Sequence, residues 1–242
     1  MKSRWTSVLE RAVSVLAWIS GMCAFVPVCL MVLLASLVAP VKRFDPLTKL
    51  GCRLIMRFLF VGVKVEGLAN FRKAGTYLFV ANHVNIFDVF VLYGHIPNYF
   101  RGIELDEHFD WFFYGPVIRR LGMIPVSQTN PNSALGSLKR ALRVIRRGTS
   151  LLILPEGGRT LDGDLQPFKN GAFILAKKAG VDIVPTVMIG AFHIKRKGSL
   201  LIRPGKMTLR FGPAIAYADI KDLTVEQLAA LVRGRMLALS GS

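Results

Sequence analysis

The sequence has 242 residues, 52% of them hydrophobic, and its 32 lysines and arginines outnumber 15 aspartates and glutamates to give a formal net charge of +17. This length suits one α/β domain with an appendage, and the apolar excess beside basic charge favours an anionic membrane surface as a partner. A nucleic-acid binder is excluded, because no binding motif accompanies the charge, which collects on one helix and around an apolar run.

The first element in chain order is an uncharged apolar run over residues 12–41. It exceeds the roughly 20 residues that a membrane-spanning helix needs. Because Gly21 and Pro27 interrupt it, one interpretation is a single tilted span and the other is two short helices hinged near Pro27. Basic residues flank both ends, which favours the hinged hairpin with both feet on the cytoplasmic side. A buried pair of soluble helices is a third alternative.

Cysteines and histidines indicate neither a disulfide framework nor a metal site, and the change in composition near residue 60 divides the chain. Three cysteines, at positions 23, 29 and 52, show neither a disulfide framework nor metal-ligand spacing, and we interpret them as packing residues in a reducing cytoplasm. The histidines have no ligands at metal spacing, so we expect no structural metal. We predict an N-terminal membrane-associated helical segment over residues 1–60 and an α/β domain over residues 61–242.

Beyond residue 60, short apolar runs alternate with helical segments. Strands are predicted at 61–67, 76–81, 98–105, 122–127, 150–154, 181–190 and 206–215. Helices are predicted at 84–96, 133–147, 168–180 and 224–239. In the helix 133–147, one face carries Leu135, Leu138, Leu142 and Ile145, and the other face is basic. This alternation predicts an α/β fold with a mostly parallel central sheet flanked by helices, preceded by the N-terminal apolar helical membrane segment.

A histidine and an aspartate five residues apart stand where the strand 76–81 ends, in the run NHVNIFD. On a straight helix such residues point about 140° apart, because each residue turns the chain by about 100°. His83 and Asp88 can therefore meet only if the chain bends, as it does when a strand ends near Asn82 and a helix begins near Phe87. This motif alone leaves a capping role for His83 as the alternative.

A second candidate segment, PEGGRT, follows the strand that begins at residue 150. Active sites of open α/β sheets gather at the carboxyl ends of strands, where this segment would join the His83 segment. Gly157 and Gly158 let a ligand approach the backbone, and the fork of Arg159 suits a phosphate or a carboxylate. Glu156 lies three residues before Arg159, and a surface ion pair between the two is the alternative.

Several motifs, in order, resemble those of the glycerolipid acyltransferase family. NHVNIFD is similar to the HX4D motif of that family, and GPVIRRLGMIPVSQ is similar to its second block. LPEGGRT resembles the third block, in which Thr usually stands at the position of Gly158. FKNG and IVPT resemble downstream elements, so the resemblance covers roughly residues 61–215. The chain departs from the family in having Gln128, where Arg is common, and in a longer segment between Leu105 and Gly115.

The resemblance implies the activity of a 1-acyl-sn-glycerol-3-phosphate O-acyltransferase. A fatty acyl group would pass from acyl-CoA or acyl-ACP, as co-substrate and without a bound cofactor, to the free hydroxyl of a lysophospholipid, giving phosphatidic acid. His83 would act as general base and Asp88 would orient it. Arg159, supported by Glu156 and by the amides of Gly157 and Gly158, would hold the acceptor phosphate.

The basic flanks and the apolar run predict a location on the cytoplasmic face of the inner membrane, against anionic lipid, and no nucleic-acid partner is expected. The basic helix 133–147 is expected to help hold the protein there. The resemblance adds acyl carrier protein as a candidate partner. One alternative is an acyltransferase for another lysolipid headgroup, since both departures lie in the region that the resemblance assigns to acceptor recognition. Another is a non-catalytic lipid-binding protein of the same fold.

Overall fold

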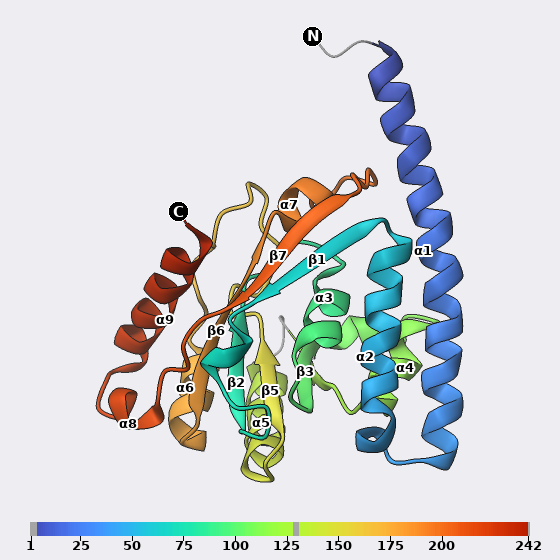
Figure 1. The fold of residues 1–242 in the computed structure, drawn as a ribbon. Helices are drawn as coiled ribbons and strands as arrows, with labels where there is room; N and C mark the ends of the chain where they lie inside the picture. The colour runs from blue at the N-terminus through green and yellow to red at the C-terminus, as the bar shows by residue number, and fades with distance from the viewer. Residues whose placement is uncertain (1–3, 128–130, 242) are drawn as a thin grey trace.

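The computed structural model describes residues 4–127 and 131–241 (Figure 1). Strands lie at β1 (Val61–Glu66), β2 (Tyr77–Ala81), β3 (Phe100–Leu105), β4 (Ile124–Val126), β5 (Ser150–Ile153), β6 (Asp182–Ile189) and β7 (Gly205–Phe211). The helices are α1 (Arg4–Val38), α2 (Val41–Phe58), α3 (Asp88–His95), α4 (Tyr114–Arg120), α5 (Pro131–Arg146), α6 (Gly171–Ala179), α7 (Ala191–Ile194), α8 (Tyr217–Ile220) and α9 (Val225–Ser240). Short 3-10 turns lie at η1 (Leu68–Asn70) and η2 (Asp106–Asp110).

Within the described residues the strands form one seven-stranded sheet in the order β1-β7-β6-β2-β5-β3-β4. All neighbours run parallel except β6 and β7, which are antiparallel. The central strand β2, YLFVA, is buried at every position, as expected for a parallel strand covered on both faces. The predicted fold class, α/β with a mostly parallel sheet, is confirmed.

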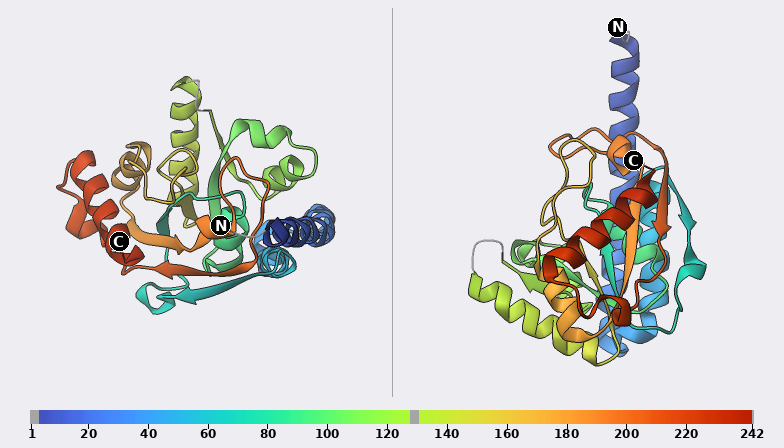
Figure 2. Two further views of the ribbon diagram at one scale, coloured as in Figure 1. Left: turned by 90° about the horizontal axis from the view of Figure 1, so that it is seen from above. Right: turned by 90° about the vertical axis from the view of Figure 1, so that its left-hand side faces the viewer.

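The core divides into two layers because alternate residues of each strand point to opposite faces of the sheet. Phe79 and Ala81 of β2 join a cluster with α1 to α4, whereas Leu78 and Val80 join a cluster with α5, α6 and α9. Figure 2 shows the two helical layers on either side of the sheet. The N-terminal helices and the basic helix α5 therefore cover opposite faces.

The apolar N-terminal run forms one continuous helix, so the predicted hinge near Pro27 is wrong. Pro27 lies inside α1, and the chain turns back only after Val38 to begin α2. The helix has the length and composition to cross a membrane over Val8–Val38. A proline removes one backbone hydrogen bond, a loss that a long helix packed along a neighbour tolerates.

α1 and α2 lie side by side at close range, as Figure 1 shows. Two glycines make this approach possible. A Cβ on Gly21 would lie 2.5 Å from Cδ2 of Leu59, and a Cβ on Gly51 would lie 2.7 Å from Cγ1 of Val28. Residues 1–60 were predicted as helical, but a separate helix α2 was not, because its apolar positions are mixed with lysines, arginines and Pro46.

The sequence also misplaced one part of α5. Leu135 was expected on the buried face but is 52% exposed, whereas the small residues Ser137 and Ala141 are buried beside Ile145. The buried face of α5 is thus rotated about the helix axis relative to the row of leucines. The division of the chain at residue 60 remains a prediction, with α1 and α2 before β1 in the structure.

A buried ion pair fixes α2 to the segment between α3 and β3. Nζ of Lys49 lies 2.8 Å from Oδ2 of Asp45, and their side chains are only 9% and 6% exposed. Lys49 also donates to the carbonyl oxygens of Pro97 and Asn98, at 3.1 and 2.8 Å, and the hydroxyl of Tyr93 donates to Oδ1 of Asp45 at 2.9 Å. Each charge therefore has several partners, as a buried pair requires.

We expect Lys49→Met to lower the free energy of unfolding by about 3–5 kcal/mol, because it leaves the carboxylate of Asp45 buried and unpaired. Lys64→Met is a matched control, since Lys64 is 73% exposed in its pair with Glu66 and its loss should change the free energy of unfolding far less. Urea unfolding in detergent compares the two. Equal losses would show that the Lys49 pair does not anchor α2.

Candidate active site

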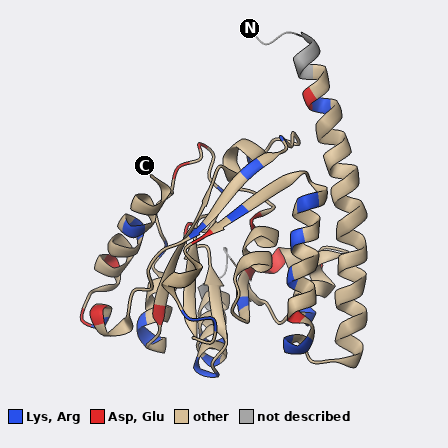
Figure 3. Ribbon diagram, in the orientation of Figure 1, with Lys and Arg blue, Asp and Glu red and all other residues tan. Residues whose placement is uncertain are grey.

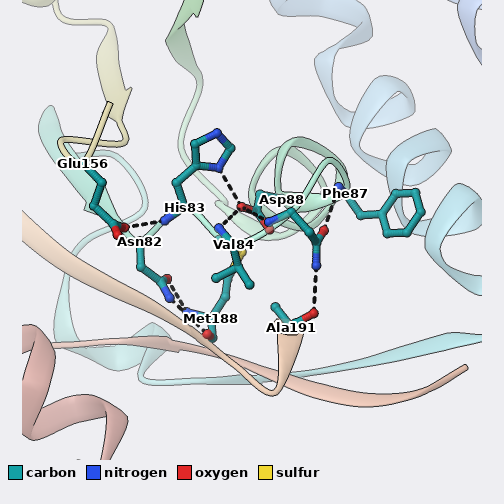
Figure 4. Close-up of polar contacts among 9 residues, drawn as sticks. Asn82, His83, Val84, Phe87, Asp88, Glu156, Met188 and Ala191 are labelled. Carbon is teal, nitrogen blue, oxygen red and sulfur yellow. Dashed lines mark hydrogen bonds and ion pairs between the residues drawn. The ribbon is translucent and has the colours of Figure 1, made fainter. Parts of the chain in front are cut away.

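The site begins where β2 ends, at the carboxyl edge of the parallel strands. Asn82, the first residue after β2, pairs with the backbone of Met188 in β6: its Nδ2 donates to the carbonyl oxygen at 3.2 Å and its Oδ1 accepts from the amide at 2.8 Å. This pairing agrees with the expected role of Asn82 in shaping the turn. It fixes the point at which the chain leaves the sheet toward His83 (Figure 4).

His83 and Asp88 meet because the chain bends between β2 and α3. Nδ1 of His83 lies 2.9 Å from Oδ2 of Asp88. Asp88 is buried, and the His83 side chain is 26% exposed. The imidazole thus has one nitrogen held by a carboxylate, while its other nitrogen makes no hydrogen bond to any described residue.

The carboxylate of Asp88 is itself held by the loop that it organises. The same Oδ2 accepts from the amide of Val84 at 2.6 Å and from the amide of Asn85 at 3.0 Å. Asp88 is also the first residue of α3, where the helix dipole favours a negative charge. Asn85 donates to the carbonyl oxygen of Ala191 at 2.8 Å and so ties the loop to α7.

The backbone of His83 is fixed at both ends by the segment after β5. Its amide donates to Oε1 of Glu156 at 2.6 Å, and its carbonyl oxygen accepts from the amide of Thr160 at 2.9 Å. The second oxygen of Glu156 accepts from the amide of Gln166 at 2.8 Å. One buried carboxylate of the PEGGRT segment therefore joins the His83 loop to Gln166, in the loop that follows PEGGRT.

This arrangement corrects the role expected for Glu156. The sequence suggested that Glu156 supports Arg159, but no ion pair joins these two in the part of the chain that the structure describes. Burial raises the pKa of Glu156, while the two amide hydrogen bonds and the nearby His83 partly oppose that shift. The carboxylate holds the backbone of His83 in place. A glutamate suits this position because each of its two oxygens accepts one amide hydrogen bond.

Arg159 lies beside this centre, on the segment between Gly158 and Thr160. Its half-buried guanidinium makes no hydrogen bond or ion pair with any described residue. Lys195, at the end of α7, is buried and donates to the carbonyl oxygen of Ser199. Burial lowers the pKa of Lys195, and the nearby charge of Arg159 lowers it further.

The structure thus brings His83, Asp88 and Glu156 together and sets Arg159 with its two glycines at their edge. Sequence reasoning missed Thr160, Gln166 and Lys195. Thr160 ends the PEGGRT run and could have been included, whereas nothing local in the sequence marks Lys195, which comes from a distant loop. Gln128, one of the two departures from the family pattern, lies outside the described residues.

Comparison with known proteins agrees with this geometry. The chain is 30% identical over 181 residues to a 1-acyl-sn-glycerol-3-phosphate acyltransferase of Limnanthes douglasii, covering 74% of this chain and 63% of that one. It is 31% identical over 138 residues to the enzyme of the same name from Helicobacter pylori (strain J99 / ATCC 700824), covering 57% and 58%. It therefore spans less than two thirds of the length of these relatives.

The fold has a solved counterpart. The crystal structure of the 1-acyl-sn-glycerophosphate acyltransferase PlsC from Thermotoga maritima superposes with a TM-score of 0.81 over 97% of both chains, at 21% identity. The sequence model of the acyltransferase family matches residues 62–189, which hold the central part of the sheet and both site segments. On this match, over more than half of its length, the chain belongs to the acyltransferase family.

Proposed function

We propose that the protein is a 1-acyl-sn-glycerol-3-phosphate O-acyltransferase, which moves a fatty acyl group from an acyl thioester to the free hydroxyl of a lysophospholipid to give phosphatidic acid. The observation that carries the proposal is the 2.9 Å contact between Nδ1 of His83 and Oδ2 of Asp88. It leaves the other ring nitrogen available at the carboxyl edge of the sheet. The names of the relatives support the choice of acceptor.

The reaction needs a base because a neutral hydroxyl is a poor nucleophile. With the proton on Nδ1 directed at Asp88, Nε2 of His83 accepts the hydroxyl proton as the oxygen attacks the thioester carbonyl. Asp88 stabilises the imidazolium that forms. When the tetrahedral intermediate collapses, the carbon–sulfur bond breaks and the imidazolium returns its proton to the leaving thiolate. The nucleophile belongs to the substrate, so the enzyme supplies none.

The acceptor phosphate has a place beside this base. Arg159 is half-buried, Lys195 is buried, and the charge of Arg159 lowers the pKa of Lys195. Two such cations favour a dianionic ligand, and a planar guanidinium can hold a phosphate through two oxygens. The amide of Gly158 lies on the same segment and would add a donor, whereas the amide of Gly157 already donates to the carbonyl oxygen of Leu154 at 3.2 Å.

The two N-terminal helices suit attachment to the cytoplasmic face of the inner membrane. In α1 only 22% of the most apolar window is buried, so most of that surface needs an apolar environment. The helix is almost free of charge in Figure 3, whereas α2 carries lysines and arginines along its length. α2 also exposes a stripe of Leu47, Leu50, Leu54 and Phe58. Apolar faces beside cations favour anionic lipid.

An acyl-transfer assay on the purified protein tests the proposal, with a panel of lysolipids as acceptors and with acyl-CoA and acyl-ACP as donors. Transfer to lysophosphatidic acid is the expected result, and use of acyl-ACP would make acyl carrier protein a partner. Transfer to a different lysolipid alone would replace the acceptor. No transfer to any acceptor would favour a non-catalytic lipid-binding protein of this fold.

We expect His83→Ala to lower kcat by about 10²–10⁴-fold, because general-base catalysis contributes that much. Asp88→Asn should also lower kcat, because its amide cannot hold the same tautomer and stabilise the imidazolium. His193→Ala, at an exposed histidine of α7, is the control and should change little. A well-folded His83→Ala enzyme within tenfold of the wild type would remove His83 from the base role.

Glu156 and Arg159 should give opposite kinetic signatures. Glu156→Gln should lower kcat and leave the acceptor KM nearly unchanged, because a glutamine has one acceptor oxygen and cannot hold both amides. Arg159→Ala should raise the acceptor KM more than it lowers kcat, with partial rescue by Lys. Arg196→Ala controls for loss of a nearby positive charge. A raised acceptor KM in Glu156→Gln would restore a direct role of Glu156 in phosphate binding.

The two glycines of PEGGRT should respond differently to alanine. Gly157 has a φ of +68°, which costs an alanine roughly 1–2 kcal/mol, and the displaced loop should lower kcat/KM by about tenfold. At Gly158 a Cβ would meet no atom within 4 Å, so Gly158→Ala should remain within about twofold of the wild type. Steady-state kinetics on both variants decide this, and equal losses would mean that the loop needs open space at both positions.

A further inference from the structure

Three consecutive aromatic residues project from the connection between β3 and α4. Trp111, Phe112 and Phe113 are 45%, 85% and 37% exposed. They lie in the segment between Leu105 and Gly115, where the chain is longer than the family pattern. Soluble surfaces rarely present such a cluster, so its exposure indicates contact with an apolar partner.

The connection is firmly built. Glu104 accepts from Nδ1 of His108 at 2.9 Å and from the hydroxyl of Tyr114 at 3.0 Å, which ties the start and the end of the segment together. The ring of Trp111 packs against both, at 4.5 Å from His108 and 6.0 Å from Tyr114 between centroids. The fold therefore holds the aromatic side chains outward, since the groups that could draw them in are already bonded to each other.

The cluster continues the apolar surface of the N-terminal helices. α4, which follows Phe113 directly, packs against α1, and Tyr114 lines an apolar cavity together with Phe25 and Cys29 of α1. Seen from above, in the left view of Figure 2, α1 has α2 on one side and the η2–α4 connection on the other. All three reach the same outer edge of the molecule.

The neighbouring surface identifies the partner as lipid. α1 is the helix that could cross a membrane, and its outward face stays apolar along its length, with Val15, Ile19, Met22, Leu30 and Leu34 all exposed. The aromatic cluster continues the apolar face of α1, so it should contact the same lipid. Tryptophan and phenylalanine suit the interface between headgroups and acyl chains.

We propose that Trp111, Phe112 and Phe113 form a second lipid-contacting element, which enters the membrane interface beside α1 on the side opposite α2. This inference rests on the proposed membrane function and adds a site to it. Contact on both sides of α1 would fix the rotation of the protein about that helix, and so the direction in which His83 faces. The element works by insertion and takes no part in the chemistry.

The first test measures binding to vesicles of phosphatidylcholine and phosphatidylglycerol. Phe112→Ser should weaken binding by roughly tenfold, because a phenylalanine buried in the interface is replaced by a small polar residue. Leu135→Ser is the matched control, since Leu135 is similarly free of neighbours on α5, across the sheet, and should not matter. Equal binding by the wild type and Phe112→Ser would overturn the proposal.

The second test leaves Trp111, Phe112 and Phe113 unchanged. In a protein with Trp5→Phe and Trp18→Phe, the only remaining tryptophan is Trp111. Vesicles with brominated acyl chains should quench its fluorescence, and the absence of quenching would overturn the proposal. A second outcome would also overturn it: the wild type forms a dimer that Phe112→Ser dissociates, and Trp111 shows no quenching. The cluster would then bind a second copy of the chain.

Activity separates this inference from the proposed function. Acyl transfer to detergent-dispersed lysophosphatidic acid should be the same for Phe112→Ser and the wild type, while transfer in vesicles falls with binding. If the wild type transfers no acyl group in either setting, the proposed function fails, whereas Trp111 quenching still decides the membrane contact.

Discussion

The carboxylate of Glu156 is the interaction on which the site depends. It stands between the amides of His83 and Gln166 and so joins a loop that follows β2 to a loop that follows β5. β2 and β5 are adjacent parallel strands, but adjacency alone does not fix the loops beyond their ends. Burying a charge between them is costly, as the raised pKa of Glu156 shows, and two short amide hydrogen bonds offset that cost.

A second carboxylate repeats this arrangement on the other side of the histidine. Asp88 gathers the imidazole and two backbone amides on a single oxygen at the start of α3. His83 is thus fixed through its backbone by Glu156 and through its side chain by Asp88. In the proposed mechanism, a base held at both points would lose little entropy in reaching its substrate, which is the condition for efficient proton transfer. Both carboxylates are engaged by backbone amides, while Arg159 beside them makes no hydrogen bond or ion pair with any described residue.

The sequence predicted the parts of this structure that depend on local pattern. The apolar run of β2, the bend before Asp88 and the strand before PEGGRT each follow from residues near one another, and each lies where the pattern indicates. Sequence patterns gave wrong predictions where contacts between distant residues determine the structure. Pro27 suggested a turn, but contacts along α2 keep α1 continuous. The bond between Glu156 and His83 joins residues 73 apart, and no periodicity reports on it.

The close contact of α1 with α2, through Gly21 and Gly51, has a consequence for how such a protein would meet its substrates. Side chains pack closely at both glycines, so α1 cannot turn against α2 without repacking. In the proposed membrane setting, the catalytic domain could not tilt away from the bilayer to bind a lipid from solution. Lysophospholipids would have to arrive by diffusion within the leaflet, and the encounter would take place in two dimensions at a height above the bilayer centre that the helix sets.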